Sequence, residues 1–433
     1  MTEPVPPRLL PDDEIKALLK ERIDTYRLSV GISLGITDSG QRRFVSFGSN
    51  RHVPRGPVDA DTIFEIGSVT KLFTVLLLAD MAHRGEISID DPVAKHLPSH
   101  VQVPMRGGQV MTLAHLACHT SGLPRIPHDI DAVFSANPYA GYSEDRLYEF
   151  LGSCALSWPS GQREEYSNLG MGLLGHVLSL RAGTDYESLL KARICTPLGM
   201  ANTSIALSSA MEKALATGHD DSLDPVPNWD LGVLAGAGGL RSNVSDLLSF
   251  LEAFDRPAPS LAAAIDLFKA PVESGGLGRR WPTPDGHTLI HHEGHTGGYN
   301  AFVGYIPEWR RGVVVLANGY PAAASALGRH LLDPRCGDLW FRREADVDPG
   351  QFDRLLGTYR ISPHFALTVM QERDRLYVQA TGQRRIRVFP ASAWHYFCKA
   401  VGAQLTFEAG PDRRATRLIL HQNGRDQIAA RID

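Results

Sequence analysis

Three short segments carry the residue types and spacings that could do chemistry. In the first, Ser68 and Lys71 lie three residues apart where a helix is expected to begin, so both side chains would project from one turn and could share a hydrogen bond. The second offers the phenol of Tyr166 and the amide of Asn168. The third is His295-Thr296-Gly297, whose glycine would let a substrate backbone lie close. A serine beside an amine, with these groups around it, indicates an acyl-transfer site.

Each segment also has an ordinary structural interpretation when it stands alone. Serine is common at helix N-termini, and a second Ser-x-x-Lys lies at Ser188 to Lys191 inside an amphipathic helix. Tyr166 could be a core aromatic residue, and His295 could be a strand histidine. The ordered set of three segments favours catalysis. So does the strongly apolar helix expected from Leu72 to Met81, directly after the first segment.

At these motifs the chain resembles the penicillin-recognising serine hydrolases, in their class C β-lactamase-like branch. This branch includes DD-carboxypeptidases, D-aminopeptidases, class C β-lactamases and related carboxylesterases. Tyr166-Ser167-Asn168 resembles the class C pattern and differs from the Ser-Asp-Asn of class A enzymes. The resemblance covers roughly residues 10 to 340. Further stretches agree in the same order: Leu116 to Pro124, Pro159 to Gly161, Pro197 to Met200 and Gly238 to Ser242.

The resemblance implies a role for each residue of the site. Ser68 is the expected nucleophile, and Lys71 and Tyr166 are expected to share the proton transfer, with either one able to act as the base. Lys71 can do so only if its pKa falls well below the usual value of about 10.4, through desolvation or a nearby positive charge. The backbone N–H groups of Ser68 and Gly298 would form the oxyanion hole. Asn168 would hold the substrate amide or orient Lys71.

The third motif, His295, Thr296 and Gly297, is expected to bind the substrate. β-Lactamases carry a lysine where His295 lies, and a histidine is mostly neutral near pH 7, so it anchors a substrate carboxylate less well. His-Thr-Gly resembles some DD-carboxypeptidases and argues against efficient β-lactamase activity. A metal site at His291-His292-Glu293-Gly294-His295 is disfavoured, because the zincin pattern is His-Glu-x-x-His on a helix and this spacing is one residue short. No metal or cofactor is expected.

Composition narrows the class of protein. The chain has 433 residues, 43% of them hydrophobic, and a net charge of −4, which are typical of a soluble globular protein with more than one domain. Without a basic run, nucleic acid is not an expected partner. No stretch approaches the roughly 20 apolar residues of a membrane helix, so no membrane association is expected. The expected partner is a small-molecule or peptide-like substrate, and the sequence leaves the oligomeric state open.

Two features of the sequence bear on the cellular compartment in which the protein works. Met1 to Asp13 is proline-rich and acidic and lacks the basic and apolar regions of a secretory signal, so a cytoplasmic location is expected. The five cysteines are odd in number and widely spaced, which favours reduced structural thiols.

The expected secondary structure is an α+β domain. A helix is predicted over residues 12–27 and strands over 30–36 and 43–48, followed by a largely helical middle and by strands over 288–292, 302–306 and 313–317. Strands at both ends of this region imply one sheet assembled from distant segments. The family resemblance implies a mainly antiparallel sheet flanked by helices, beside an all-helical region, with the site between them.

From residue 351 onward the pattern changes to short alternating segments, such as 366–370, 375–380, 403–408 and 416–421. They predict a small antiparallel β-barrel, which resembles the lipocalin-like C-terminal domain of some D-aminopeptidase relatives. We therefore expect a β-lactamase-like serine hydrolase domain over residues 1–345 and a barrel domain over 346–433.

The predicted function is that of a serine hydrolase acting through an acyl-enzyme on peptide-like amides, in the manner of a β-lactamase or D-alanyl-D-alanine carboxypeptidase. The alternative is a carboxylesterase for short acyl esters that uses the same residues. A catalytically silent penicillin-binding or scaffolding protein is disfavoured by the complete set of motifs.

Overall fold

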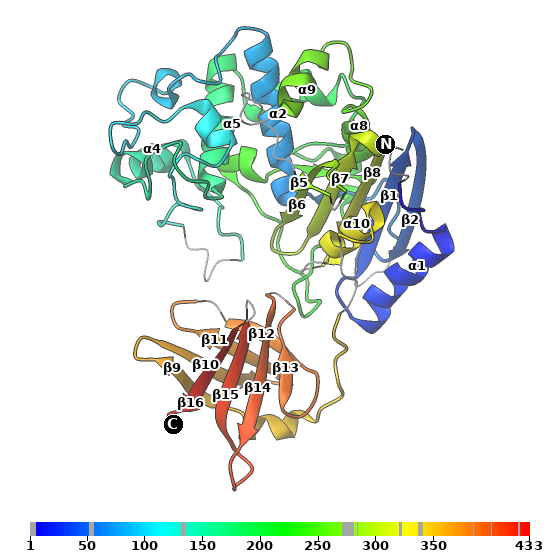
Figure 1. Ribbon diagram of the computed structural model, residues 1–433, viewed down its shortest axis with the longest axis vertical. Helices are drawn as coiled ribbons and strands as arrows, with labels where there is room; N and C mark the ends of the chain where they lie inside the picture. The colour runs from blue at the N-terminus through cyan, green and yellow to red at the C-terminus, as the bar shows by residue number, and fades with distance from the viewer. Residues whose placement is uncertain are drawn as a thin grey trace.

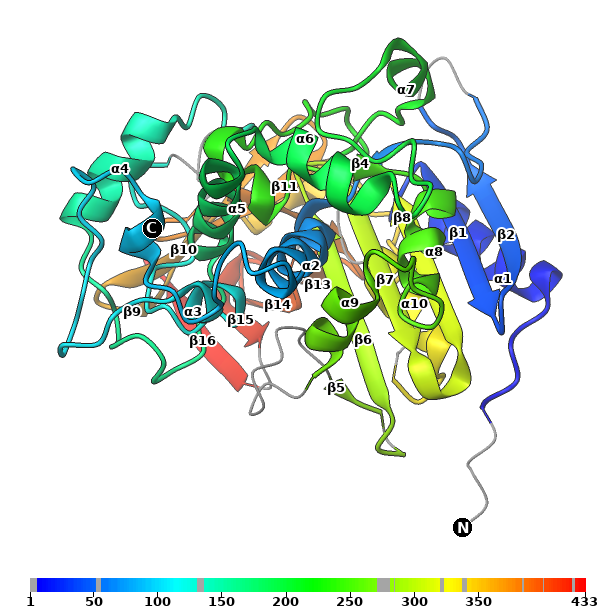
Figure 2. The same ribbon diagram turned by 90° about the horizontal axis from the view of Figure 1, so that it is seen from above.

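The structure is a computed structural model that describes residues 6–51, 56–130, 136–270, 281–283, 285–319, 323–336, 341–383, 385–399, 401–422 and 425–433. The first five residues of the proline-rich segment lie outside these ranges. Figures 1 and 2 show a sheet with helices on both faces, a helical region beside it, and a separate barrel formed by the C-terminal part. Within the described ranges, no helix is long and apolar enough to cross a membrane.

The described strands of the first part form a six-stranded sheet in the order β2-β1-β8-β7-β6-β5. All its neighbours pair antiparallel, and β1 from the start of the chain pairs with β8, so that Ile32 lies opposite Ala317. The predicted α+β sheet from distant segments is thus confirmed. The strands are β1 Gly31–Asp38, β2 Gln41–Gly48, β5 Trp281–Pro282, β6 Thr288–His295, β7 Asn300–Ile306 and β8 Arg311–Ala317.

Helices cover both faces of this sheet. On one face α1 packs on β2 and α10 on β7 and β8, and on the other face α8 packs on β1, β7 and β8. The helix predicted over residues 12–27 is shorter: α1 ends at Lys20, a π-helical turn follows over Glu21–Thr25, and Arg27 has a positive φ of 52°, which a right-handed helix does not continue. The bounds are α1 Asp12–Lys20, α8 Val244–Glu252, α9 Ala262–Lys269 and α10 Ala323–Leu332.

The helical region is arranged around α2, Thr70–His83, which contacts α5, α6 and α9. Every residue from Thr70 to Met81 is buried, as expected for a helix that is apolar on all sides. This helix therefore holds its N-terminal end at a fixed place between the helical region and the sheet. The other helices here are α3 Leu113–Ala117, α4 Glu144–Ser153, α5 Asn168–Ala182, α6 Tyr186–Leu190 and α7 Ser209–Ala214.

The C-terminal part forms a closed barrel in which described strands β9 to β16 follow one another and β16 returns to pair with β9. The predicted antiparallel barrel is confirmed. Its centre is filled by a separate core that includes Leu355, Tyr359, Leu405 and Phe407. The strands are β9 Gly357–Ser362, β10 Phe365–Glu372, β11 Arg375–Ala380, β12 Arg385–Pro390, β13 His395–Phe397, β14 Ala403–Ala409, β15 Ala415–Gln422 and β16 Arg425–Arg431.

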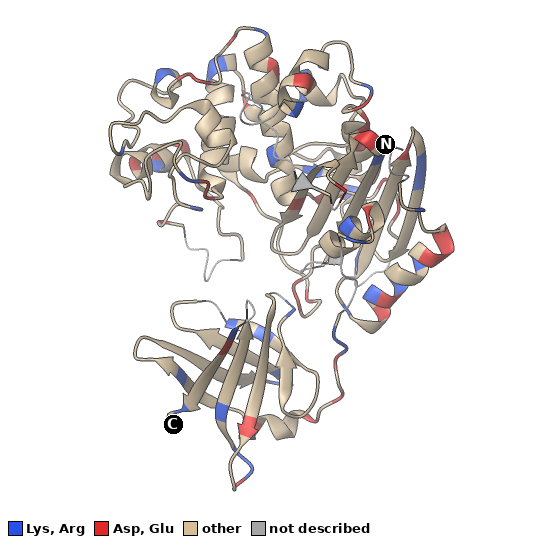
Figure 3. Cartoon of the chain, in the orientation of Figure 1, with Lys and Arg blue, Asp and Glu red and all other residues tan. Residues whose placement is uncertain are grey.

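Charged groups join the barrel to the rest of the molecule. Arg375 on β11 forms an ion pair with Asp224, and Lys399 donates to the carbonyl oxygens of Tyr26 at 3.0 Å and Arg27 at 3.2 Å. Figure 3 shows basic residues at the end of β11 and β12 that faces the larger part. The barrel is thereby docked with these two strands toward the end of the sheet where β6 terminates (Figure 1).

Candidate active site

Ser68 lies in a 3₁₀ turn, Gly67–Val69, between the short strand β3 (Phe64–Glu65) and α2. Gly67 has a φ of +49°, and a Cβ atom there would lie 2.8 Å from the backbone N and O of His295. Only glycine fits such a position without strain. The turn is thus pressed against β6, and the serine of the first motif lies beside the third motif.

The side chains of the first two motifs converge on the Ser68 hydroxyl. Lys71 Nζ donates to Ser68 Oγ at 2.8 Å and to the Ala237 carbonyl oxygen at 2.5 Å, and Tyr166 Oη donates to Ser68 Oγ at 2.9 Å. Burial lowers the pKa of Lys71 well below its usual range, and the nearby guanidinium of Arg125 lowers it further. An amine with so low a pKa can be neutral near pH 7 and can accept the serine proton.

Burial has the opposite effect on Tyr166 and raises its pKa to about 12, against the smaller lowering effects of the Ser68 hydrogen bond and of Arg125. The Tyr166 ring lies close to two cations, with Lys71 Nζ 4.9 Å and Arg125 Cζ 5.0 Å from its centre. The His119 ring lies 4.6 Å away, and Nδ1 of this histidine accepts a hydrogen bond from the Ser167 N–H at 3.2 Å. Tyr166 is therefore held protonated and firmly oriented.

The oxyanion hole expected at the N–H groups of Ser68 and Gly298 stays a prediction, and it depends on the turn that follows β6. Between β6 and β7 the chain turns at Gly298, whose carbonyl accepts from the His219 N–H at 3.1 Å. Among the described residues the Gly298 N–H has no acceptor. A Cβ at Gly298 would lie 2.6 Å from the backbone of Gly218 and His219, and one at Gly294 would lie 1.9 Å from the Ile66 carbonyl. Glycines thus let the strand end, the turn and the nucleophile pack closely.

The third motif forms the wall beside the serine. His295, the last residue of β6, opens to the cavity, and its Nε2 accepts from Asn300 Nδ2 at 2.7 Å. The protein around it lowers its pKa by desolvation. Thr296 is buried, and a Cβ at Gly297 would lie 2.8 Å from Trp229 Nε1, so glycine allows this close approach.

Asn168 is the first residue of α5 and faces the same cavity. Its Nδ2 donates to Tyr139 Oη at 3.2 Å, and its buried Oδ1 has no hydrogen-bond partner in the described part of the chain. No hydrogen bond joins it to Lys71 among these residues, which favours the expected role in binding a substrate amide over that of orienting the lysine.

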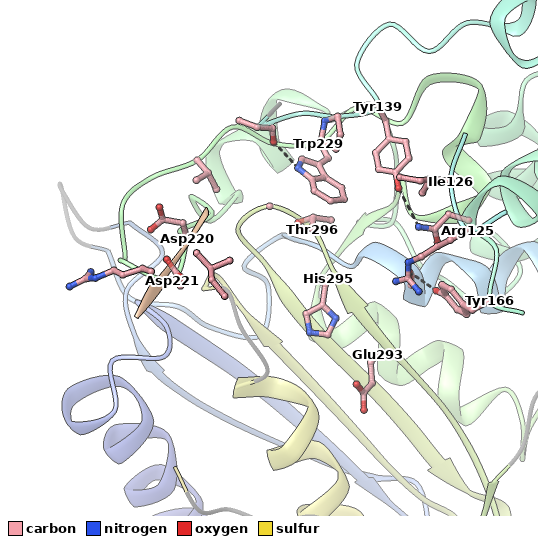
Figure 4. A pocket seen from close by; sticks show the side chains of 18 of the residues that line it. Arg125, Ile126, Tyr139, Tyr166, Asp220, Asp221, Trp229, Glu293, His295 and Thr296 are labelled. Carbon is pink, nitrogen blue, oxygen red and sulfur yellow. Dashed lines mark hydrogen bonds between the residues drawn. The ribbon is translucent and has the colours of Figure 1, made fainter. Parts of the chain in front are cut away.

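A cavity of about 840 Å³ brings these residues together. Ser68, Tyr166, Asn168 and the whole third motif line it, while Lys71 lies buried beneath Ser68. Figure 4 shows Tyr166 and Arg125 on one side of it, His295 and Thr296 in the middle and Asp220 and Asp221 on the other side. Lining residues that the sequence did not single out include Arg125, Tyr139, Asp220, Asp221, Trp229, Tyr377, Arg385, Ile386 and Arg387.

These additional residues differ in how they could have been found. Arg125 directly follows the stretch Leu116 to Pro124 that carried the family resemblance, so its place near the site was signalled. Tyr377, Arg385, Ile386 and Arg387 come from β11 and β12 of the barrel. No local pattern marks them, because their position depends on how the barrel docks.

The histidine side chains of the run on β6 contact different partners. The His291 ring lies 5.9 Å from the Phe302 ring, and His292 Nδ1 donates to the Glu293 carbonyl oxygen at 2.7 Å. The described residues hold no group of three or more His, Cys, Asp or Glu side chains that could bind a metal ion. The second Ser-x-x-Lys also lies apart from the cavity, with Ser188 exposed on α6 and Lys191 paired to Glu187 at 2.7 Å.

Comparisons with known proteins agree with this geometry. The family model described as Beta-lactamase matches residues 15–333, and a domain of unknown function, DUF3471, matches residues 342–430. Penicillin-binding protein 4* of Bacillus subtilis is 26% identical over 421 residues, covering 89% of this chain and 91% of that protein. The D-alanyl-D-alanine-carboxypeptidase/endopeptidase AmpH of Escherichia coli is 26% identical over 314 residues, covering 68% of this chain and 80% of AmpH.

A class C β-lactamase from Rhodobacter sphaeroides has a similar solved structure, with a TM-score of 0.62 and 26% identity over 73% of this chain and 97% of that one. The first family model covers well over half of the chain, and the motifs that carried the resemblance converge in one cavity. The chain therefore belongs to the Beta-lactamase family of serine hydrolases.

Proposed function

We propose that this protein hydrolyses peptide-like amides through an acyl-enzyme on Ser68, as a β-lactamase or D-alanyl-D-alanine carboxypeptidase does. The observation that carries this proposal is the placement of Ser68 Oγ within hydrogen-bond distance of both Lys71 Nζ and Tyr166 Oη. The named relatives, a penicillin-binding protein and a carboxypeptidase/endopeptidase, support this substrate class.

We infer the proton transfers from these hydrogen bonds and from the opposite pKa shifts of Lys71 and Tyr166. Neutral Lys71 accepts the Ser68 proton as Oγ attacks the substrate carbonyl, and the N–H groups of Ser68 and Gly298 stabilise the negative oxygen. Tyr166 donates its proton to the leaving nitrogen, and the proton held by Lys71 then restores Tyr166. In the second half of the reaction, a water molecule transfers a proton to the pair of Lys71 and Tyr166 and attacks the acyl ester on Ser68. This attack releases the carboxylic acid, and the pair returns a proton to Ser68 Oγ. The low pKa of Lys71 and the high pKa of Tyr166 favour these roles over the reverse.

The alternative function, a carboxylesterase for short acyl esters, is favoured by one observation. A phenol with a pKa of about 12 is a weak acid, and an alcohol or phenol leaving group needs less protonation than an amine. His295, with its lowered pKa, also offers little charge to the carboxylate of a penicillin. Esters without a carboxylate would thus suit the site.

Acylation and turnover test the two functions together. A fluorescent penicillin should label the wild-type protein and the Ser68→Ala variant should remain unlabelled, while Ser188→Ala, which removes the exposed serine of the second Ser-x-x-Lys, should label normally. Rates with nitrocefin, a D-Ala-D-Ala peptide and p-nitrophenyl esters then rank amide against ester. If Ser68→Ala keeps full activity on every substrate, the proposal is wrong. Labelling without any turnover would indicate a binding protein.

We also propose that the barrel is lipocalin-like and that the protein works in the cytoplasm. A closed barrel of eight strands in sequential order is the architecture of lipocalins. None of the five cysteines forms a disulfide in the described part of the chain, which fits a reducing compartment. Fractionation of the native host tests the location, and recovery of the protein with a secreted fraction would overturn it.

A further inference from the structure

Arg125 lines the cavity through a guanidinium group that lies over the Tyr166 ring. Its backbone is fixed, since its carbonyl oxygen accepts from the N–H of Asn168 at 2.8 Å and of Leu169 at 3.3 Å, at the start of α5. The side chain itself is exposed to the cavity. Stacking on a ring engages the flat face of a guanidinium and leaves the N–H groups at its edge able to bind an anion.

Within the part of the chain that the structure describes, the charge of Arg125 has no counter-ion. Among the described residues, its side chain forms no ion pair and donates no hydrogen bond to another residue. An exposed guanidinium that lines the cavity and has no counter-ion among the described residues can offer its N–H groups to an anion.

The acidic residues that line the same cavity are engaged elsewhere. Asp220 Oδ1 accepts from the N–H groups of Ser222 and Asp224. Glu293 forms an ion pair with Arg329. Asp221 lies on the far side of the cavity, in the electrostatic field of Arg387 and Lys399 of the barrel. None of them supplies the counter-charge of Arg125.

The position of Arg125 relative to Ser68 defines which part of a substrate it would meet. Figure 4 shows Arg125, Tyr139 and Tyr166 on one side of the cavity, with His295 and Thr296 in the middle. Asn168 lines the cavity and donates to Tyr139 Oη, so it lies on the side of Arg125. Asn168 is the residue placed to hold the substrate amide, on the part that becomes bound to Ser68. The leaving group would therefore lie toward the third motif, and Arg125 faces the acyl group.

We propose that Arg125 forms an anion-binding subsite for the acyl group, so that the preferred acyl donor carries a carboxylate on the part that is transferred to Ser68. This inference rests on the proposed function, because it names the substrate class of the same site. A charged hydrogen bond between a guanidinium and a carboxylate is short and strong, and the planar fork can donate two such bonds to one carboxylate.

Two esters that differ only at the far end of the acyl chain isolate the effect of the acyl carboxylate. Mono-p-nitrophenyl adipate carries a carboxylate at the far end of its acyl chain, and p-nitrophenyl hexanoate has a methyl group there. We expect the wild-type protein to prefer the adipate, and Arg125→Gln to lower the adipate-to-hexanoate ratio of kcat/KM by about tenfold or more. Arg125→Lys should keep part of the preference. Arg163→Gln, which removes an exposed arginine stacked on Trp158 outside the cavity, should change nothing.

Arg125 also lowers the pKa of Lys71, and the experiment separates the two effects. Loss of this electrostatic effect would reduce both rates equally and move the acidic limb of both pH profiles to higher pH. An equal loss on both esters, or an unchanged ratio, overturns the anion subsite. Hydrolysis of both esters that survives in Ser68→Ala would instead overturn the proposed function.

A measurement on the wild-type protein makes the test independent of how the variants fold. Attraction of the adipate carboxylate to Arg125 is screened by salt, whereas the hexanoate carries no charge. Raising NaCl from 20 to 500 mM should therefore lower kcat/KM for the adipate several-fold relative to the hexanoate. If the wild-type protein shows neither a preference for the adipate nor this salt dependence, the subsite does not exist.

Discussion

The side-chain amide of Asn300 donates a hydrogen bond to Nε2 of His295 at 2.7 Å. The amide cannot be turned around, because its Oδ1 accepts from the Ala324 N–H at 2.7 Å and its Nδ2 also donates to the Gly294 carbonyl oxygen at 3.2 Å. Nε2 must then be the unprotonated nitrogen of a neutral ring. Asn300 thus keeps the positive charge of an imidazolium out of the substrate site, and desolvation acts in the same direction.

Asn300→Asp should raise the pKa of His295, because a carboxylate would accept a hydrogen bond from the Nε2–H group and stabilise the imidazolium. Titration of the His295 ring protons by NMR measures the shift, with the His395 ring on the barrel surface as an internal reference. In the wild-type protein the lowered pKa means that the unfolded chain binds the proton more readily, so His295 should reduce stability as pH falls below about 6.5. This loss should be smaller in the variant. An unchanged pKa would show that Asn300 does not control the ring.

His295→Lys should improve the use of substrates with a carboxylate on the leaving side, such as penicillins, relative to neutral esters. A lysine adds a full positive charge where the wild-type protein has a neutral ring, and a hydrogen bond to a charged group contributes about 1.5–3 kcal/mol. The ratio of kcat/KM for a penicillin to that for a p-nitrophenyl ester should rise tenfold or more. With the fold verified by circular dichroism, an unchanged ratio would mean that His295 does not face the substrate carboxylate.

Substitutions of the two proton-transfer residues should have different signatures. Lys71→Arg keeps a side chain that remains protonated, so acylation should fall by about 10²–10⁴-fold for amides and esters alike. Tyr166→Phe removes the proton donor and should slow amides more than p-nitrophenyl esters. In the wild-type protein the acylation rate should rise with pH through the lowered pKa of Lys71, as the amine loses its proton. Equal effects of Tyr166→Phe on both substrate types would contradict its role as the acid.

Asp221→Asn should stabilise the protein at pH 8 and have little effect near pH 4. Burial is the main reason that the pKa of Asp221 rises to about 6, above the usual value of about 3.9, although Arg387 and Lys399 partly oppose it. The folded state therefore binds a proton that the unfolded chain has lost between these two pH values, and stability falls as pH rises through this window. Thermal unfolding at both pH values measures the effect.

Asp224→Asn is a control for this measurement, because its expected effect on stability at pH 8 has the opposite sign. Its ion pair with Arg375 lowers the pKa of Asp224, so this substitution should lower the melting temperature slightly at pH 8 and less at acidic pH. If Asp221→Asn also destabilises the protein at pH 8, the carboxylate is held more favourably than its burial implies.

The sequence by itself determined the chemistry of the first three motifs and the class of fold. Ser68 and Lys71 are three residues apart on one turn, so their proximity is a local consequence of helix geometry. Apolar residues alternate along β14, which is buried on one face, and form a continuous run in β8, which is buried on both, so each strand leaves a pattern in the sequence. Strand β12 was not among the predicted segments, although its start, Arg385 to Val388, alternates polar and apolar residues.

Only the tertiary structure decided what surrounds these motifs. The pKa of Lys71 depends on burial under α5 and on Arg125, and the neutral state of His295 depends on an amide whose orientation is fixed by α10. Tyr377 and Arg387 of the barrel form part of the cavity wall. Their position depends on how the barrel docks on the rest of the molecule, through ion pairs such as that of Arg375 with Asp224. These features arise between residues far apart in sequence. Electrostatic fields and packing act across space, so no local pattern records them.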